Sequence, residues 1–513
     1  MTRQSSLVLG LDCSTSACKA VVWDCRGNAM ARGHSPLALI IPQPTWHEQP
    51  AESWWTAMVL AIRQAVSQID GKRLRALCIA HQRETFVPVD EQGQVLTNGI
   101  VWMDERAREL LPGLEQVFGQ ENFHRLTGKR LSVNLTVAKI AWLKEYQPDI
   151  FARTCKFLDV HSFLVHRLTG LYRTGWGCAD PTGMFDMQNS CWAESILRQV
   201  GIRLDQLPEV YPPGTVVGTI TPSVAEACGL PAGLPVVAGI GDGQASGLGV
   251  NITSPGEAYL SLGTSVISGT YSDQYVYNPA CRTMTGGIPG TYLLETVLLG
   301  GAYTLTWFME KIAAQPGQNA AQLQDFYDRA ASAVPPGSAG LIVVPYWNGV
   351  LAPYWDPAAS GIIVGWRGVH QLAHLYRAIL EGLAFEQQLA TQGVEKALGQ
   401  PVQRYIAMGG GAQSNLWCQI IADITNKPVF RATSTEAAAL GAGILAATAA
   451  GCYPDARQAA QEMTHILPEP TEPEASRHDF YKRLFEEVYQ PLFPALQVYL
   501  DRLASLSNLN PPG

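Results

Sequence analysis

The sequence predicts an α/β protein that contains two domains of one design. Short β-branched runs alternate with longer helical patterns, which is typical of mixed sheets covered by helices. The segment LVLGLDCSTSACKAVVWDC (7–25) reads as a hairpin around a loop of small and hydroxyl residues, and AYLSLGTSVISGT (258–270) repeats that design. A repeated hairpin indicates a duplication in which both loops point into one shared cleft. A chain of 513 residues is also too long for one ordinary core.

The individual elements follow from the hydrophobic pattern. Strands are expected at 7–11, 19–23, 76–80, 100–103, 236–240, 257–262, 266–270, 292–298, 341–345 and 404–408. Helices are expected at 52–69, where Trp55, Met58 and Ile62 share one face, and at 371–397, 414–425 and 436–449. We expect an N-terminal domain over 1–250, a second domain over 251–455 and a helical extension over 456–513, with a hinge in ITSPGEA (252–258).

Composition restricts the partners and the compartment. A net charge of −8 and a pI near 5.7 argue against binding to nucleic acid or to an anionic membrane. The sequence has no signal-peptide pattern at its start and no apolar run of about 18 residues. Its 11 scattered cysteines include no C-x-x-C pair, which indicates free thiols. We therefore expect a cytoplasmic protein.

The two hairpin loops are candidate anion sites. Asp12 ends the first apolar run and is followed by Ser14 and Thr15, while Gly263 and Thr264 occupy the second loop. Small residues let backbone N–H groups approach an anion. Neither loop has the GK[ST] ending and the following helix of a P-loop. For each loop taken alone, the favoured interpretation is a common turn; the recurrence of the pair makes that interpretation less favoured.

Two further segments place polar residues after a strand. In VVAGIGDGQASG (236–247), Asp242 lies between glycines, either as an accessible carboxylate at the carboxyl end of a strand or as a structural turn residue that caps a helix. In RYIAMGGGAQSN (404–415), three glycines let the backbone lie against a flat or anionic ligand, and Ser414 or Asn415 can cap the next helix.

Charged residues follow two other strands. IAHQRETFVPVD (79–90) presents Gln82, Arg83 and Glu84, which can offer a donor fork and an acceptor to a hydroxylated ligand. VWMDER (101–106) similarly ends in Asp104. The alternative in each case is a surface ion pair of little energetic weight.

In their order and spacing, these motifs resemble the FGGY family of carbohydrate kinases. The resemblance extends from about residue 7 to 450, although the tetrapeptide FGGY itself is absent. It implies a duplicated actin-like, ribonuclease-H-like ATPase fold with the active site in the cleft between two domains. It also implies phosphoryl transfer from ATP, with Mg²⁺, to a hydroxyl of a small sugar or polyol.

The resemblance also implies a role for each motif. Asp12 would hold the magnesium–phosphate group, and Asp242 would be the general base. Arg83, Glu84, Asp104, Asn134 and Asp242 would bind the sugar. The residues that would bind the nucleotide are Ser14, Thr15, Gly263, Thr264, Gly301, Gly410, Gly411 and Asn415.

Several substrates remain open. The run QRET (82–85) is similar to glycerol kinases, whereas YLSLGTS (259–265) and LEGLAFE (380–386) look more like xylulokinases, and kinases of the quorum signal autoinducer-2 also carry an Arg-Glu pair. Asn134 stands where glycerol kinases have Tyr, and Gly243 separates the base from Gln244, so both positions leave room for a longer substrate than glycerol. The balance favours a xylulokinase-like pentulose kinase.

Two functions of other classes share parts of this pattern. An actin-like ATPase would need the phosphate loops but not the QRE run, and a sugar-sensing binding protein would need only the sugar contacts. The presence of both sets favours the enzyme. The sequence leaves open whether the chain is a monomer or a homodimer.

Overall fold

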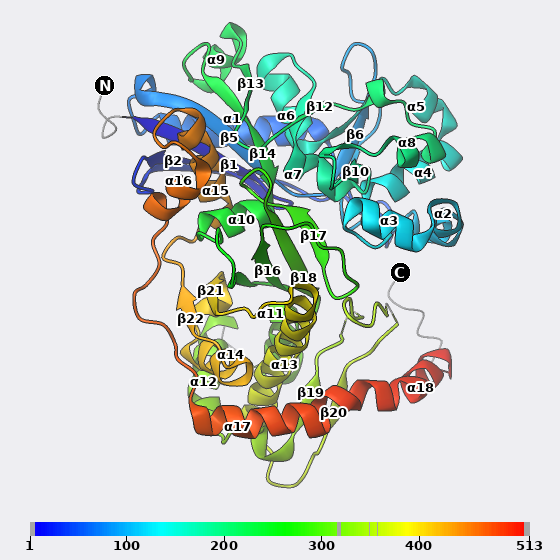
Figure 1. The fold of residues 1–513 in the computed structure, drawn as a ribbon, viewed down its shortest axis with the longest axis vertical. Coiled ribbons are helices and arrows are strands. Elements are labelled where there is room, and N and C mark those ends of the chain that lie inside the picture. Colours follow the sequence, from blue (N-terminus) through cyan, green and yellow to red (C-terminus); the bar gives the residue numbers. More distant parts are fainter. Residues whose placement is uncertain (1–5, 315–319, 348, 357, 507–513) are drawn as a thin grey trace.

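The computed structural model describes residues 6–314, 320–347, 349–356 and 358–506, and it contains two six-stranded sheets, one above the other in Figure 1. The first sheet has the order β13 (Val216–Thr219), β14 (Pro235–Gly241), β5 (Leu74–His81), β1 (Leu7–Cys13), β2 (Ala17–Asp24) and β3 (Ala29–Pro36). The second has the order β17 (Arg282–Thr285), β18 (Tyr292–Leu298), β16 (Val266–Ser272), β15 (Glu257–Leu262), β21 (Arg404–Met408) and β22 (Val429–Arg431).

The two sheets repeat one topology. β1 pairs antiparallel with β2 and parallel with β5, and β15 pairs in the same way with β16 and β21. The helix α10 (Asp242–Gly249) follows β14 just as α15 (Ala437–Ala449) follows β22. The predicted duplication and both predicted hairpins are therefore confirmed.

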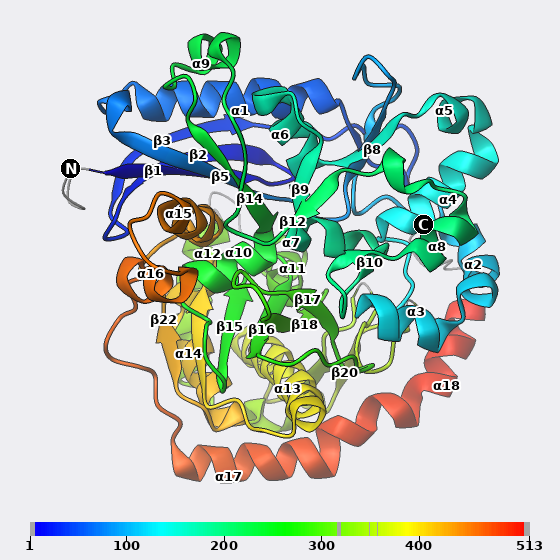
Figure 2. The same cartoon turned by 45° about the horizontal axis from the view of Figure 1, so that its top comes forward.

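Alternating side chains on the strands of the first sheet give it two buried faces. Leu7, Leu9 and Leu11 pack in the core that contains α1 (Ala51–Val66), whereas Val8 packs in the core that contains α15. Figure 2 shows α1 along one face of this sheet and α15 on the other. The α1 helix buries Trp54 in place of the expected Trp55 and ends before Ile69.

The helices α10 and α15 cross between the two sheets through small residues (Figures 1 and 2). A Cβ atom added to Gly249 would lie 2.0 Å from the Ala437 carbonyl oxygen, and one added to Gly441 would lie 1.9 Å from that of Ala245. Side chains at these glycines would push the helices apart, so the closeness of the two halves depends on them.

The remaining elements cover or extend these sheets. A four-stranded sheet has the order β4 (Glu48–Gln49), β7 (Gly99–Ile100), β6 (Phe86–Val89) and β8 (Lys156–Asp159). The short strand pairs are β9 (Arg173–Gly175) with β12 (Glu209–Tyr211), β10 (Phe185–Asp186) with β11 (Cys191–Trp192), and β19 (Ile342–Val344) with β20 (Ile362–Val364).

Most of the other helices form two groups along the chain. The first half adds α2 (Leu111–Phe118), α3 (Gln120–Thr127), α4 (Thr136–Tyr146), α5 (Pro148–Arg153), α6 (Val160–Thr169), α7 (Trp176–Ala179), α8 (Glu194–Val200) and α9 (Pro222–Cys228). The second half adds α11 (Gly301–Trp307), α12 (Ala320–Ser332), α13 (Leu372–Leu398) and α14 (Asn415–Thr425). The C-terminal helices are α16 (Ala456–Met463), α17 (Ala475–Leu484) and α18 (Gln490–Leu506).

Some expectations need correction or stay untested. The strand expected at 100–103 is only Gly99–Ile100, because the chain turns where Asp104 accepts hydrogen bonds from backbone N–H groups. The domain limits 1–250, 251–455 and 456–513, and the hinge, remain predictions; α15 and α16 pack on the first sheet. Among the described residues, no helix combines the length and the apolar character that crossing a membrane requires.

Candidate active site

Asp12 is placed by the first hairpin next to the start of α15. It lies opposite Lys19 across the β1–β2 pair, and Lys19 forms a 2.8 Å ion pair with Glu436. The Oδ1 atom of Asp12 is buried and has no hydrogen-bond partner among the residues that the structure describes. Burial and the nearby charge of Asp242 raise the pKa of Asp12 to about 7, although Lys19 opposes them. A buried carboxyl oxygen that lacks a described partner fits a Mg²⁺ ligand, since Mg²⁺ prefers carboxylate oxygens.

The two hydroxyl residues of the first loop have different partners. The Ser14 hydroxyl donates to the Ala17 carbonyl at 3.0 Å and closes the turn. The Thr15 hydroxyl donates to Gln82 Oε1 at 3.1 Å and accepts from Trp102 Nε1 at 3.0 Å. Thr15 therefore connects the first hairpin loop to the strand end that carries Arg83 and Glu84.

The second loop is held by the start of α11. The backbone N–H of Ala302 donates to the Gly263 carbonyl at 2.9 Å, and that of Tyr303 donates to the Thr264 carbonyl at 3.0 Å. A Cβ atom on Gly301 would lie 2.5 Å from the Val266 nitrogen, so only glycine lets the helix approach this closely. The structure thus brings Gly301 to the second loop, together with Gly263 and Thr264.

The glycine-rich segment lies between β21 and α14. Gly411 packs on the ring of Trp417, which a Cβ atom would approach to 2.3 Å, whereas Gly410 faces open space. Ser414 is the helix cap, since its side chain accepts from the Trp417 N–H at 3.1 Å. Asn415 lines a hollow of about 310 Å³ with residues of α12, α13 and α17. The open space at Gly410 fits a ligand that lies against the backbone.

Five charged side chains from both halves form one connected group, which we call the charge cluster: Arg83, Glu84, Asp242, Arg282 and Glu295. Arg83 contacts Asp242 Oδ1 through Nε at 3.1 Å and Glu295 Oε2 through Nη1 at 2.9 Å. Arg282 donates to Glu84 Oε1 at 3.0 Å and, through Nε, to Glu295 Oε1 at 2.6 Å. The cluster therefore joins the predicted base to the predicted sugar-binding residues and to two residues of the second half.

Solvent reaches the members of the cluster unequally. The side chains of Asp242 and Arg282 are 39% and 24% exposed, whereas those of Arg83, Glu84 and Glu295 are 7%, 5% and 1% exposed. Burial alone would raise the pKa of Glu295, but Arg282 and Arg83 outweigh it and lower that pKa to about 2. Glu295 is thus a buried carboxylate that holds both guanidinium groups.

Glu84 occupies a strained backbone position. Its φ angle is 59°, which a residue other than glycine rarely adopts. Its carbonyl accepts hydrogen bonds from Thr136 Oγ1 at 2.9 Å and Lys139 Nζ at 3.2 Å, both from α4. Strain that neighbouring residues hold in place is typical of functional sites.

Asp104 and Asn134 support the loop that contains Trp102 and follows β7. Asp104 is fully buried, and it accepts from Arg106 Nε and Nη2, each at 2.8 Å, and from the His47 N–H at 2.6 Å. The Asn134 amide donates to the Trp102 carbonyl at 3.1 Å. The position of Asp104 does not support its predicted contact with the sugar, because its partners are protein groups and none of its surface is exposed.

Gly243 does not lengthen the site. A Cβ atom there would lie 2.8 Å from Glu295 Oε2 and 3.2 Å from Arg83 Cζ. The space that a side chain would take beside the base is filled by the charge cluster. The interpretation of Gly243 as extra room for a longer substrate is therefore wrong.

The sequence reasoning missed Lys19, Arg282 and Glu295. One of them carried a signal, because Glu295 interrupts the apolar strand YLLETVL (292–298) and a buried charge needs a partner. Arg282 starts a short edge strand, and nothing in RTMT (282–285) distinguishes it from a surface residue.

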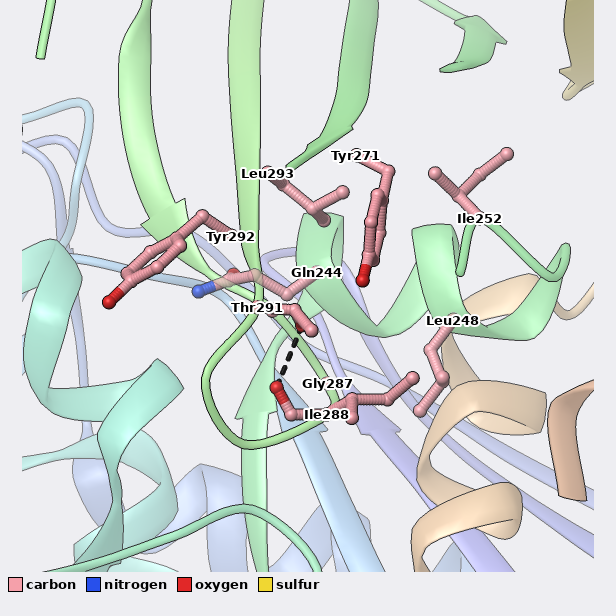
Figure 3. Close-up of a pocket in the computed structure, with 10 residues that line it drawn as sticks. Gln244, Leu248, Ile252, Tyr271, Gly287, Ile288, Thr291, Tyr292 and Leu293 are labelled. Atoms are coloured by element: carbon pink, nitrogen blue, oxygen red, sulfur yellow. Dashed lines mark hydrogen bonds between the residues drawn. The ribbon is translucent and has the colours of Figure 1, made fainter. Parts of the chain in front are cut away.

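A small pocket lies against α10 (Figure 3). Gln244, Leu248, Tyr271 and Thr291 line it together with the turn between β17 and β18, where the Thr291 hydroxyl donates to the Ile288 carbonyl at 2.7 Å. Its volume of about 10 Å³ is the space of about one water molecule. It does not include Asp242 and is too small for a sugar.

Comparison with known proteins agrees with this arrangement. Residues 7–249 match the N-terminal domain of the FGGY family of carbohydrate kinases, and residues 258–450 match its C-terminal domain. The xylulose kinase of Escherichia coli is 30% identical over 504 residues (96% of this chain, 100% of the relative), and the glycerol kinase of a Geobacter strain is 30% identical over 469 residues (88% and 92%).

Solved structures show the same fold. The gluconate kinase of Lactobacillus acidophilus superimposes with a TM-score of 0.91 at 26% identity, covering 97% of this chain and 99% of that one. The predicted two-domain, actin-like ATPase-type fold is therefore confirmed. With both of its domains matched, and with relatives aligned over most of their length, the chain belongs to the FGGY family of carbohydrate kinases.

Proposed function

We propose that this protein transfers the terminal phosphoryl group of ATP to a hydroxyl of a small sugar, and that the sugar is a ketopentose such as D-xylulose. The observation that carries the proposal is the position of Asp242. It is the most exposed carboxylate of the charge cluster, Arg83 holds it at 3.1 Å, and it lies close enough to Asp12 to raise the pKa of that group. A candidate base and a candidate metal ligand therefore lie at the same edge of the first sheet, at the ends of the two strands that flank β5.

The chemistry assigns different tasks to the two carboxylates. Asp242 accepts the proton of the sugar hydroxyl as its oxygen forms the bond to phosphorus. Arg83 fixes the orientation of Asp242 through its Nε atom. Asp12 would hold Mg²⁺, which neutralises charge on the phosphate oxygens when it is bound. Phosphoryl transfer has a loose transition state, so positioning and charge neutralisation contribute more than a strong base would.

The two halves supply the nucleotide contacts in this proposal. Ser14 and Thr15 would approach the phosphates from the first loop, and Gly263 and Thr264 from the second. Gly301, Gly410, Gly411 and Asn415 would line the adenosine site. An actin-like ATPase or a sugar sensor has no need of both sets, and the presence of both supports a kinase.

Relatives that act on different substrates leave the sugar to be tested. The names of similar proteins include xylulose kinase, gluconokinase and glycerol kinase. We propose the order D-xylulose ahead of glycerol, with an autoinducer-2 precursor as the further alternative. The test is initial ADP release at equal concentrations of glycerol, erythritol, D-xylulose, D-ribulose, D-gluconate and that precursor. A tenfold higher kcat/KM for glycerol than for D-xylulose would overturn the ketopentose assignment.

The role of the base can be tested by Asp242→Asn. Loss of proton acceptance should lower kcat by about 10² or more, while the KM for ATP changes little. The matched control is Asp205→Asn, which makes the same chemical change at a side chain that is 73% exposed and forms an ion pair with Arg203. Near-normal turnover by Asp242→Asn would remove Asp242 from the mechanism.

Location and assembly are also proposals. Nine of the cysteines are free thiols, among them eight that are at least partly buried, which supports a cytoplasmic location. A homodimer stays a prediction, which sedimentation would test.

A further inference from the structure

We propose that Arg282 contacts the substrate and selects sugars that carry a carbonyl or carboxylate oxygen away from the reacting hydroxyl, in preference to polyols. This inference rests on the proposed sugar kinase function and specifies its substrate class. Arg282 comes from the second half of the chain, at the start of β17.

Position and exposure distinguish Arg282 from Arg83, the other cation of the cluster. Arg83 is 7% exposed and lies between Asp242 and Glu295, whereas Arg282 is 24% exposed. Arg282 connects to the base through Glu295 and Arg83, and it contacts Glu84 directly. A sugar whose hydroxyl meets Asp242 would therefore find Arg282 as the accessible cation of the same cluster.

The hydrogen bonds of Arg282 leave donors for a ligand. A guanidinium group has five N–H bonds and no acceptor. Nε and Nη2 use one each toward Glu295 Oε1, and Nη1 uses one toward Glu84 Oε1. Five minus three leaves two N–H bonds, one on each Nη atom, that have no partner in the described part of the chain. Carbonyl and carboxylate oxygens only accept, whereas a hydroxyl must also place its own proton, so the former match this group better.

The strand that carries Arg282 is fixed to the first half of the molecule. The buried Lys129 donates to the Thr283 carbonyl at 2.9 Å. The buried Asp180 accepts from the N–H and the hydroxyl of Thr285, each at 2.6 Å. The residues directly after Arg282 are thus held by both domains, so its donors are preorganised and little ordering is needed on binding.

Charge decides between the two kinds of acceptor. The cluster has two guanidinium groups and three carboxylates, so its formal charge is 2 − 3 = −1. The carboxylate of an aldonate would add a further negative charge and gains nothing from this net negative charge. A neutral carbonyl avoids that repulsion and retains the hydrogen bonds. We therefore expect the preference ketose over aldonate, and both over the polyol of equal length.

The experiment measures kcat/KM for D-xylulose, D-gluconate and xylitol with the unaltered protein, Arg282→Met, Arg282→Lys and the control Arg329→Met. Xylitol is xylulose with the carbonyl reduced, so the two sugars form a matched pair. Arg329 forms an exposed pair with Asp325 on α12, which gives the same substitution away from the site. Arg282→Met should lower kcat/KM at least about tenfold for D-xylulose, mainly through KM, because a hydrogen bond to a charged group is lost. The change for xylitol should stay within about twofold.

Arg282→Lys covers the case in which the methionine variant unfolds. It keeps the positive charge near Glu84 and Glu295 but lacks the planar set of N–H donors of a guanidinium group. It should retain the melting temperature and still lose xylulose preference over xylitol. Equal losses on D-xylulose and xylitol would show a purely structural role, and no loss on either would show that Arg282 does not contribute; both outcomes would overturn the inference alone. Failure of the unaltered protein to phosphorylate any sugar would overturn the proposed function, and this inference with it.

Discussion

His161 shows at the scale of one residue how the core fixes β14, the strand that leads to the proposed base Asp242. It is fully buried on α6, its Nδ1 lies 3.1 Å from the Thr174 hydroxyl, and its Nε2 accepts from the Gly239 N–H at 3.0 Å. Gly239 belongs to β14, three residues before Asp242. Burial lowers the pKa of His161 to about 4; the neighbouring His81 acts in the same direction and Asp159 opposes it. The imidazole is therefore neutral at physiological pH.

We expect His161→Gln to cost about 1–3 kcal/mol at pH 7.5, because the Gly239 N–H loses its partner. In the unaltered protein, the folded-state pKa is below the unfolded value of 6.5, so this contribution is present above pH 6.5 and is lost as the pH falls to about 4. The stability difference between the two proteins should therefore shrink as the pH falls over that interval. Urea unfolding at several pH values measures this, with the exposed His34→Gln as the control. A difference that does not vary with pH would contradict a buried neutral imidazole.

At the scale of elements, the crossing of α10 and α15 determines how closely the two halves approach. We expect Gly441→Ala to destabilise the protein by about 1–3 kcal/mol or more, because its Cβ would lie 1.9 Å from the Ala245 carbonyl oxygen. The variant should also lower kcat, since α10 begins with Asp242. The control Gly113→Ala lies in α2 with no atom within 4 Å of its Cβ and should be neutral or stabilising by up to about 1 kcal/mol. Equal melting temperatures for Gly441→Ala and the unaltered protein would contradict tight packing at the crossing.

The elements also show which features a sequence can reveal. The hairpins, Asp242 and the QRE run were predictable because each depends on a local pattern, an apolar run that ends in small or polar residues. The partners of Arg83 were not, since Glu295 is 212 residues away and reaches it only through the duplication. The same reason explains the error at Gly243, whose vacant side-chain space is taken by a distant residue. Local sequence therefore predicted several of the segments that meet at the candidate site, and long-range contacts determined how the space there is filled.

At the scale of the whole molecule, the halves meet at β17, close to the proposed sugar-binding residues, and where α15 and α16 pack on the first sheet. Lys129 with Thr283 and Asp180 with Thr285 join the first half to β17, and α10 crosses α15 between the sheets. The proposed nucleotide contacts at Gly410 and Asn415 lie after β21, on another part of the second sheet. A rotation that closes the two halves should therefore pivot about these two groups of contacts and move the glycine-rich segment most.

This arrangement predicts that closure requires both ligands. A sugar bound by the charge cluster contacts residues that already touch one another, so D-xylulose alone should change the radius of gyration little. A Mg²⁺ complex of a non-hydrolysable ATP analogue would bridge the loops of both halves, and together with D-xylulose it should give the largest decrease in small-angle scattering. Asp242→Asn should still close, because it removes proton acceptance and not the bridging contacts. An unchanged radius of gyration with both ligands at saturation would mean that the two hydroxyl loops do not grip one nucleotide from opposite domains.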